Sequence, residues 1–408
     1  MKLFTRMIVL LAAFNIVCYP QWFSQQSNTG NHLLGICMID ANTGFVVGDL
    51  ATIRKTTNAG LNWSTITPPV NNDYGGISFI NSDTGLAVGP PGLLIETYNS
   101  GSTWLTRNYL GSGLRNVQFV SRNRAYAVGS AGIIRSDDGG VSWTRISTTQ
   151  VGGIYFLTED IGTVVGPNGL ILTTTNGGIN WTQRIIGLPV QFGDSSLSCV
   201  KYVNTLTGYV CGNNGIVIKT TNGGTNWIYL PTGVLSSLTG VYFTDVNTGT
   251  VVGNTGRIMR TTNGGNNWFS QPVPPPNTTN PLYGVDFVNS YTGWIVGFNG
   301  MILYTSNGGM TWINPISNEI PEQFSLSQNY PNPFNPITKI KFQIPNSSKV
   351  KLIIYDILGR EEAILVNEKL NPGAYEVEFE GSNFSSGVYY YALTANEYKE
   401  TKKLVLLK

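Results

Sequence analysis

A short tryptophan-containing motif recurs seven times along the chain, and this repeat limits the possible folds more than any other feature. Each copy follows the pattern Thr/Ser-x-Asn/Asp-x-Gly-x-Asn/Thr/Ser-Trp. The tryptophans are Trp63, Trp104, Trp143, Trp181, Trp227, Trp268 and Trp312. The turn residues five positions before them are Asn58, Asn99, Asp138, Asn176, Asn222, Asn263 and Asn307. Successive copies lie about 40 residues apart, a period typical of propeller blades.

The sequence between the tryptophans predicts four short strands in each repeat unit. In the sixth unit, apolar or alternating stretches cover residues 240–243, 250–253 and 257–260, and the tryptophan opens a fourth stretch. The motif itself predicts a tight hairpin, because Asn-Gly and Asp-Gly accommodate positive φ angles and the Asn or Asp side chain accepts hydrogen bonds from turn amides. We expect the tryptophan to pack between neighbouring units. Four strands repeated seven times predict an all-β, seven-bladed β-propeller over residues 21–316.

These repeats resemble the Asp-box repeats of sialidases, sortilin ectodomains and xyloglucanases. The unit as a whole resembles the propellers of the photosystem II assembly and stability factor family, with the same Gly-x-Val-Val-Gly strand and Thr-Thr-Asn-Gly-Gly-x-x-Trp turn. The resemblance covers roughly residues 30–316. It implies that the boxes lie on the blade rims, away from the ligand face, so we interpret all seven as structural.

Two segments compete for the fourth strand of the last repeat unit. Residues 21–25 read Gln-Trp-Phe-Ser-Gln and match the Trp-Phe-Ser-Gln that begins at Trp268. The other candidate is the segment after Trp312. Closure by the start of the chain would remove an exposed strand edge, but the sequence leaves both arrangements open.

The N-terminus has the pattern of a secretory signal peptide, which we assign to residues 1–20. Lys2 and Arg6 precede a short apolar core from Met7 to Val17. This core is too short to predict a membrane span, and we expect no transmembrane segment in the mature chain. Cys18 raises the alternative of a lipoprotein, but Val17 stands where a small residue is preferred. The cleavage site stays open.

Three further cysteines give an odd number, which predicts no disulfide framework. Cys199 and Cys211 fall on adjacent strands of one predicted hairpin, so a bridge between them is possible. We favour two buried free thiols, and the spacing with Cys37 does not suggest a metal site.

The repeat pattern stops near residue 316, and the chain becomes richer in Lys and Glu. We predict a linker at residues 317–325 and a second domain of short strands at residues 326–408. This domain resembles the type A C-terminal sorting domain of the type IX secretion system of Bacteroidota and their relatives. The residues that carry the resemblance are Asn332, Pro333, Phe334, Asn335, Pro336, Gly359, Arg360, Gly387, Tyr389, Lys402 and Lys403.

The resemblance of the second domain implies a small immunoglobulin-like β-sandwich. It also implies Sec export to the periplasm, passage across the outer membrane, and the type IX secretion machinery as a partner. The protein would then be secreted or held on the outer cell surface, and the sequence does not say which. A plain adhesion sandwich is the alternative interpretation.

The propeller offers few residues for catalysis. His32 is the single histidine, which argues against a His-based triad or a multi-His metal site. We find no phosphate or dinucleotide motif and expect no cofactor. The net charge of +2 argues against nucleic-acid binding. A glycosidase needs two nearby carboxylates, and Asp49 and Asp194 lie in loops predicted for one face, where they could converge.

Ligands of propellers usually meet the loops at one end of the channel. Here those loops join each fourth strand to the next first strand, and four arginines near them could form a basic arc: Arg107, Arg115, Arg145 and Arg184. Our leading hypothesis is an exported binding or scaffold protein that recognises a protein or polysaccharide through this face. The alternative is an extracellular glycan-active hydrolase or lyase, and a third possibility is a structural surface component.

Overall fold

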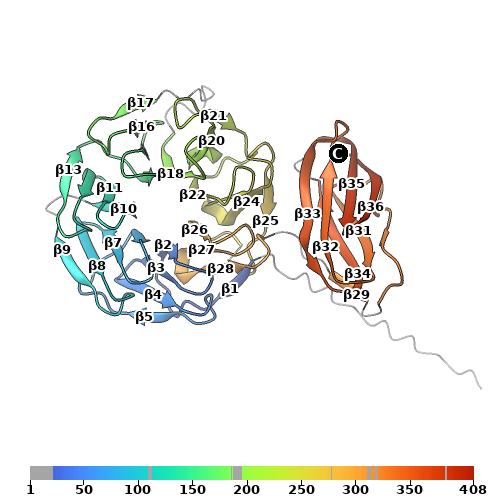
Figure 1. Cartoon of the computed structure of the whole chain (residues 1–408), viewed down its shortest axis with the longest axis horizontal. Helices are drawn as coiled ribbons and strands as arrows, with labels where there is room; N and C mark the ends of the chain where they lie inside the picture. The colour runs from blue at the N-terminus through green and yellow to red at the C-terminus, as the bar shows by residue number, and fades with distance from the viewer. Residues whose placement is uncertain are drawn as a thin grey trace, which may run out of the picture.

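The computed structural model describes residues 22–108, 113–184, 186, 195–276, 278–309, 314–317, 320–381 and 384–408. These residues form β-strands and short 3-10 turns, without an α-helix, and fold as a ring of sheets followed by a second β-domain (Figure 1). No helix among them is long and apolar enough to cross a membrane. The predicted signal peptide, Asp194 and Trp312 lie outside the described residues.

Seven four-stranded antiparallel sheets form the blades of a β-propeller. Blades 1 to 3 contain β2 (Leu33–Met38), β3 (Gly44–Gly48), β4 (Thr52–Thr56) and β5 (Ser64–Ile66); β6 (Gly76–Phe79), β7 (Gly85–Gly89), β8 (Leu93–Thr97) and β9 (Leu105–Asn108); and β10 (Leu114–Phe119), β11 (Ala125–Gly129), β12 (Gly132–Ser136) and β13 (Thr144–Ser147). Blades 4 and 5 contain β14 (Gly153–Phe156), β15 (Gly162–Val165), β16 (Ile171–Thr174) and β17 (Thr182–Arg184); and β18 (Leu197–Tyr202), β19 (Gly208–Gly212), β20 (Val217–Thr220) and β21 (Ile228–Leu230).

Blades 6 and 7 complete the ring. They contain β22 (Leu238–Phe243), β23 (Gly249–Gly253), β24 (Arg257–Thr261) and β25 (Phe269–Gln271); and β26 (Leu282–Phe287), β27 (Gly293–Gly297), β28 (Ile302–Thr305) and β1 (Phe23–Gln25). The first strands, among them β2, β10, β18 and β22, surround the centre, and the fourth strands lie at the rim (Figure 1).

The hydrophobic core lies between neighbouring blades. One buried cluster joins Tyr209 and Val217 of blade 5 to Val251 and Trp268 of blade 6, and equivalent clusters lie between the other blades. The second strands are buried, and six of the seven begin with glycine. In five of these six blades an aromatic ring of the first strand covers that position. A Cβ on Gly249 would lie 2.4 Å from the ring of Phe243.

The box turns have a common hydrogen-bond pattern, shown by the sixth. The Thr261 hydroxyl accepts from the amide of Gly265 at 2.9 Å, and Asn263 Oδ1 accepts from the amide of Asn267 at 2.9 Å. The hydroxyl-to-glycine bond recurs at 2.8–2.9 Å in all seven boxes. Trp268 is buried and meets Phe243 edge-on, with ring centroids 6.1 Å apart.

The start of the chain closes the ring. β1 pairs with β28, with Phe23 opposite Tyr304. Trp22 is fully buried, and its ring meets Phe287 edge-on at 6.0 Å, the geometry that Trp268 has against Phe243 in blade 6. The N-terminal segment therefore supplies both the strand and the tryptophan of blade 7, and this decides between the two arrangements that the sequence left open.

The strand that follows the seventh box joins the second domain instead. β29 (Asn314–Ser317) pairs with β34, in a sheet of order β29-β34-β31-β30. The structure thus differs from the predicted boundary, which put residues 314–316 in the propeller and residue 317 in a linker. The physical reason is that β1 already occupies the free edge of β28.

The second domain is a small immunoglobulin-like β-sandwich. Its first sheet contains β29, β30 (Ser325–Leu326), β31 (Ile337–Ile344) and β34 (Gly373–Glu380), and its second contains β32 (Ser348–Tyr355), β33 (Glu361–Leu370), β35 (Gly387–Ala395) and β36 (Tyr398–Leu406). Alternate side chains of both sheets form one core, which includes Phe342, Leu352 and Leu393. Phe269 of blade 6 packs against this core through Phe384.

The three cysteines of the described residues carry free thiols. Cys199 and Cys211 lie directly opposite each other on β18 and β19. The Cys211 thiol contacts the carbonyl oxygen of Leu238 at 3.7 Å. Burial raises the pKa of both thiols, so they are poor nucleophiles.

Candidate functional site

The two ends of the propeller channel have different chemistry. At one end, the next-to-last residue of each first strand contributes to a ring of seven side chains that we call the inner ring. Its members are Cys37, Ser78, Gln118, Tyr155, Lys201, Tyr242 and Asp286. At the other end, the fourth-to-first loops and the second-to-third turns surround the channel, and we call this end the loop face.

Several inner-ring side chains hold one blade to the next. A carboxylate oxygen of Asp286 accepts from the amide of Met38 at 2.7 Å and so joins blade 7 to blade 1. Ser78 Oγ accepts from the amide of Phe119 at 3.0 Å. Gln118 bonds both the amide and the carbonyl of Phe156, at 2.6 and 2.9 Å. These polar groups are already satisfied by backbone, so we interpret this ring as structural.

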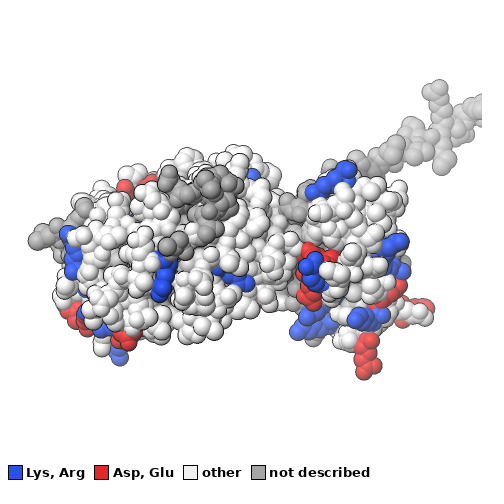
Figure 2. All heavy atoms as spheres, turned by 90° about the horizontal axis from the view of Figure 1, so that it is seen from above, with Lys and Arg blue, Asp and Glu red and all other residues white. Residues whose placement is uncertain are grey.

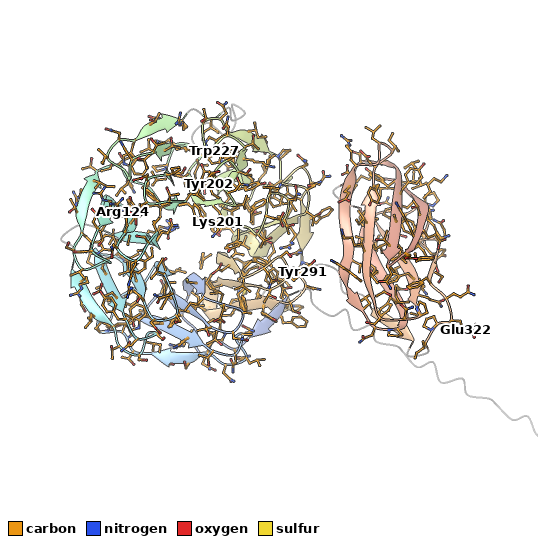
Figure 3. The ribbon with its side chains drawn as sticks, viewed as in Figure 1. Arg124, Lys201, Tyr202, Trp227, Tyr291 and Glu322 are labelled. Atoms are coloured by element: carbon orange, nitrogen blue, oxygen red, sulfur yellow. The ribbon has the colours of Figure 1, made fainter. Side chains whose placement is uncertain are left out.

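Lys201 completes the inner ring through aromatic contacts. Its ammonium lies 4.2 Å from the centroid of Tyr242 and 5.1 Å from that of Tyr155, on the channel side of blade 5 (Figure 3). Burial opposes its charge, but Tyr242, Tyr155 and Asp286 outweigh this, and the pKa of Lys201 is raised. Burial also raises the pKa of Asp286 to about 6, although Lys201 and the Met38 amide act against the rise. The positive charge of Lys201 and the negative charge of Asp286 therefore offset each other inside the ring.

At the loop-face end, the first strands of several blades contain β-bulges, which change the direction of the side chains that they carry. The first strands of five blades carry a register shift near their start, and the extra residues are Leu34, Arg115, Ser198, Thr239 and Tyr283. A bulge re-aims the side chain it carries and is common beside functional sites. In blade 4 the corresponding residue is Gly152, where a Cβ would meet no atom within 4 Å. The loop-face end of the channel thus borders open space.

Five residues from blades 7, 1 and 2 gather on the loop face, and we call them the mouth cluster: His32, Asp49, Asp73, Tyr283 and Phe298. The imidazole of His32 stacks on Phe298 with ring centroids 4.2 Å apart, and the Tyr283 ring lies 6.4 Å from it. His32 Nδ1 accepts from the amide of Asn299 at 3.1 Å, so the neutral ring carries its proton on Nε2.

The carboxylates of the mouth cluster are close enough to influence each other. One oxygen of Asp73 accepts from the amide of Leu50 at 2.8 Å, next to Asp49. Burial raises the pKa of Asp49, the charge of Asp73 raises it further, and His32 opposes this. The Asp49 carboxylate accepts no hydrogen bond from the described part of the chain. Its negative charge is therefore poorly compensated within the protein.

The structure separates the four arginines of the predicted basic arc. Arg107, Arg145 and Arg184 lie on the fourth strands of blades 2, 3 and 4, at the rim, whereas Arg115 lies on a first strand. Arg107 forms an ion pair with the buried Glu96 at 2.5 Å. Arg184 Nε donates to Thr173 Oγ1 at 2.8 Å. Of the four, the structure places only Arg115 beside the channel.

Asp73 is a described acid beside Asp49, and Asp194, the partner expected from the sequence, lies outside the described residues. The sequence analysis missed this pair and the ring stack of His32. The repeats could have indicated the pair, because their alignment places each second-to-third turn, such as that of Asp49, on the same face as the fourth-to-first loops, such as that of Asp73. Among the described residues, no group of three or more His, Cys, Asp or Glu side chains could hold a metal ion.

Charged side chains are sparse on the visible face of the propeller and denser on the second domain (Figure 2). On the propeller side opposite the loop face, Arg124 pairs with Asp137 at 2.7 Å and also lies within 3.7–3.9 Å of carboxylate oxygens of Glu159 and Asp160. Asp137 of a box turn and Glu159 and Asp160 of a first-to-second turn thus already belong to an ion-pair network, unlike Asp49.

The sorting-motif residues hold the sandwich together at its end. Asn332 Oδ1 accepts from the amide of Val405 at 2.9 Å, and the backbone of Phe334 bonds Val405 and Leu407. Asp356 accepts from the amide and the guanidinium of Arg360 in a turn that contains Gly359 with φ of 77°. This turn leaves Ile357 and Leu358 exposed.

Two family models match the chain. The family "Photosynthesis system II assembly factor YCF48" matches residues 15–154, 146–236 and 228–327. The family "Secretion system C-terminal sorting domain" matches residues 328–407. No curated protein matches the chain by sequence.

Among solved structures, YCF48 bound to a D1 peptide is 19% identical with a TM-score of 0.59, covering 71% of this chain and 98% of its own. YCF48 from Cyanidioschyzon merolae is 18% identical with a TM-score of 0.57, covering 70% of this chain and 98% of its own. PorZ, a surface component of the type IX secretion system of Porphyromonas gingivalis, is 12% identical with a TM-score of 0.55, covering 93% of this chain and 60% of its own. These likenesses show the fold.

Proposed function

Because the chain belongs to the photosynthesis system II assembly factor YCF48 family and ends in a secretion sorting domain, we propose that it is an exported binding protein that recognises a protein or polysaccharide through its loop face. The sorting domain directs the protein by type IX secretion to the cell surface or the outside. Residues 1–20 would serve as the Sec signal peptide and be removed.

The asymmetry of the channel carries this proposal. The polar groups of the inner ring bond neighbouring blades, whereas the bulges of the loop face carry Arg115, which is exposed, and Tyr283, which is partly exposed. A ligand gains most from groups that are fixed in place but not yet bonded. The first strands supply such groups on the loop face.

A peptide ligand is consistent with one family member. YCF48 has been solved bound to a D1 peptide. The present chain carries a secretion domain, so its own partner would lie outside the cytoplasm. A glycan-active hydrolase is the second candidate, because Asp49 and Asp73 influence each other on the loop face. That activity would need both carboxylates to reach one glycosidic bond.

The experiment is a combined peptide and glycan array with the mature chain and two charge-matched variants. Gly152→Arg places a long side chain in the open space of the loop face, and Leu206→Arg places the same side chain on an exposed first-to-second turn of the opposite side. We expect bound ligands that Gly152→Arg releases and Leu206→Arg retains. Equal binding by both variants would exclude the loop face, and cleavage of an arrayed glycan would favour the hydrolase.

A further inference from the structure

We propose that the mouth cluster is a subsite for a basic side chain, an arginine or lysine, of a protein ligand. This inference rests on the proposed function and deepens it, because it names the ligand chemistry of the loop face. Three aromatic rings and two carboxylates from three blades carry the argument: His32, Tyr283, Phe298, Asp49 and Asp73.

The rings form a wall that suits an organic cation. His32 and Phe298 stack at 4.2 Å with 27° between their planes, and Tyr283 is tilted by 51° to His32. All three rings are partly exposed. A cation within about 6 Å of an aromatic ring centre is attracted by the ring's negative face. Tyr283 also sits on a bulge, which fixes its direction at the start of β26.

The carboxylates supply the charge that a cation would neutralise. The Asp49 amide donates to the carbonyl oxygen of His32 at 3.0 Å, which places Asp49 beside the ring wall. Burial and the charge of Asp49 raise the pKa of Tyr283. Asp49 has Asp73 as a neighbour of like charge and no hydrogen-bond donor among the described residues. Binding a cation would relieve this repulsion, whereas a neutral sugar would leave it in place. We therefore favour a basic side chain over a glycan.

The groups of the mouth cluster favour arginine over lysine as the bound side chain. The bond from the Asn299 amide to Nδ1 fixes the orientation of the His32 ring. A guanidinium can meet a carboxylate and also stack on a ring, and both partners are present here. Arginine should therefore bind more tightly than lysine.

The test uses a fluorescent peptide of alternating glycine and arginine, and a second peptide with citrulline at each arginine position. Citrulline keeps the shape and removes the charge. The protein has a net charge of +2, so non-specific attraction of a basic peptide is not expected. We expect the mature chain to bind the arginine peptide at least fivefold more tightly than the citrulline peptide, with the difference shrinking as salt rises.

Two matched variants locate the effect. Asp49→Asn should weaken binding of the arginine peptide about fivefold, the upper range for one exposed ion pair. Asp40→Asn removes the same charge from a turn on the opposite side of the same blade, where Asn can still accept the amides of Asn42 and Thr43. It should bind as the unchanged protein does. Tyr283→Leu should also weaken binding.

Equal affinity for the arginine and citrulline peptides, or equal behaviour of Asp49→Asn and Asp40→Asn, would overturn the subsite. A neutral oligosaccharide that binds and is lost in Tyr283→Leu, without any preference for arginine, would replace it by a sugar subsite. An arrayed ligand that Gly152→Arg blocks but that does not need Asp49 would reject the subsite and keep the proposed function. If Gly152→Arg blocks no ligand and Asp49→Asn binds the arginine peptide as Asp40→Asn does, both are rejected.

Discussion

Replacing Trp22 by alanine should open the ring at blade 7, because this one side chain joins the start of the chain to its last blade. Trp22 is fully buried, packs edge-on against Phe287, and donates from Nε1 to Gln271 Oε1 at 2.9 Å. Burying an indole ring removes about 150–250 Å² from water. At about 25 cal/mol per Å², this area corresponds to about 4–6 kcal/mol of stability, and the lost hydrogen bond adds about 1 kcal/mol.

Urea denaturation followed by tryptophan fluorescence would measure the loss. All nine tryptophans precede residue 313, so the signal reports on the propeller and not on the sandwich. We expect Trp22→Ala to lower the free energy of unfolding by about 5–7 kcal/mol. Trp143→Ala is the matched control, because Trp143 belongs to an ordinary box and is only partly buried. It should cost about half as much.

A loss below about 1.5 kcal/mol for Trp22→Ala, at an unchanged dependence on urea, would refute closure by the N-terminal strand. A loss equal to that of Trp143→Ala would show that Trp22 is only one rim tryptophan among others.

Three further predictions concern stability, export and the boxes. Burial raises the pKa of Asp286 from 3.8 to about 6, so the stability gained from its protonated form is present below pH 3.8 and lost as the pH rises through 6. Asp286→Asn should therefore be up to about 3 kcal/mol more stable than the unchanged protein at pH 7.5 and equally stable at pH 3.5. Equal stability of the two proteins at pH 7.5 in thermal melts would contradict this. Deleting residues 326–408 should leave the protein in the periplasm, and undiminished delivery to the surface in cell fractionation would count against the sorting role. Trp181 is partly buried like Trp143, so Trp181→Ala should cost about 2–3 kcal/mol, and denaturant melts that show less than 1 kcal/mol would contradict its packing between blades.

Local repetition made the fold predictable from the sequence. Each box stabilises its own turn through hydrogen bonds that span four residues, such as the bond from Gly265 to Thr261. The structure of each turn therefore depends only on residues within one repeat. Alternation likewise predicted strands in the second domain, and β31 alternates between exposed and buried side chains; the sandwich itself was implied by the family resemblance. The resemblance to the two families rested on the same local motifs.

The sequence could not supply contacts that depend on closing the ring. The bond from Met38 to Asp286 joins residues 248 positions apart, and that from Trp22 to Gln271 joins residues 249 apart. Both the pairing of β1 with the edge of β28 and the mouth cluster exist only after the seven blades have come together. For this reason the arginines predicted as one arc lie apart, and His32, an isolated residue in the sequence, stands between Asp49 and Tyr283.

The sequence alone thus determined the number of blades, the structure of each turn and the presence of a sorting domain, because these depend on neighbours within one repeat or motif. The tertiary structure decided which strand closes the propeller, where the sandwich begins, and which side chains meet on the loop face. Those outcomes depend on the curvature accumulated over all seven repeats, and no single repeat contains that information.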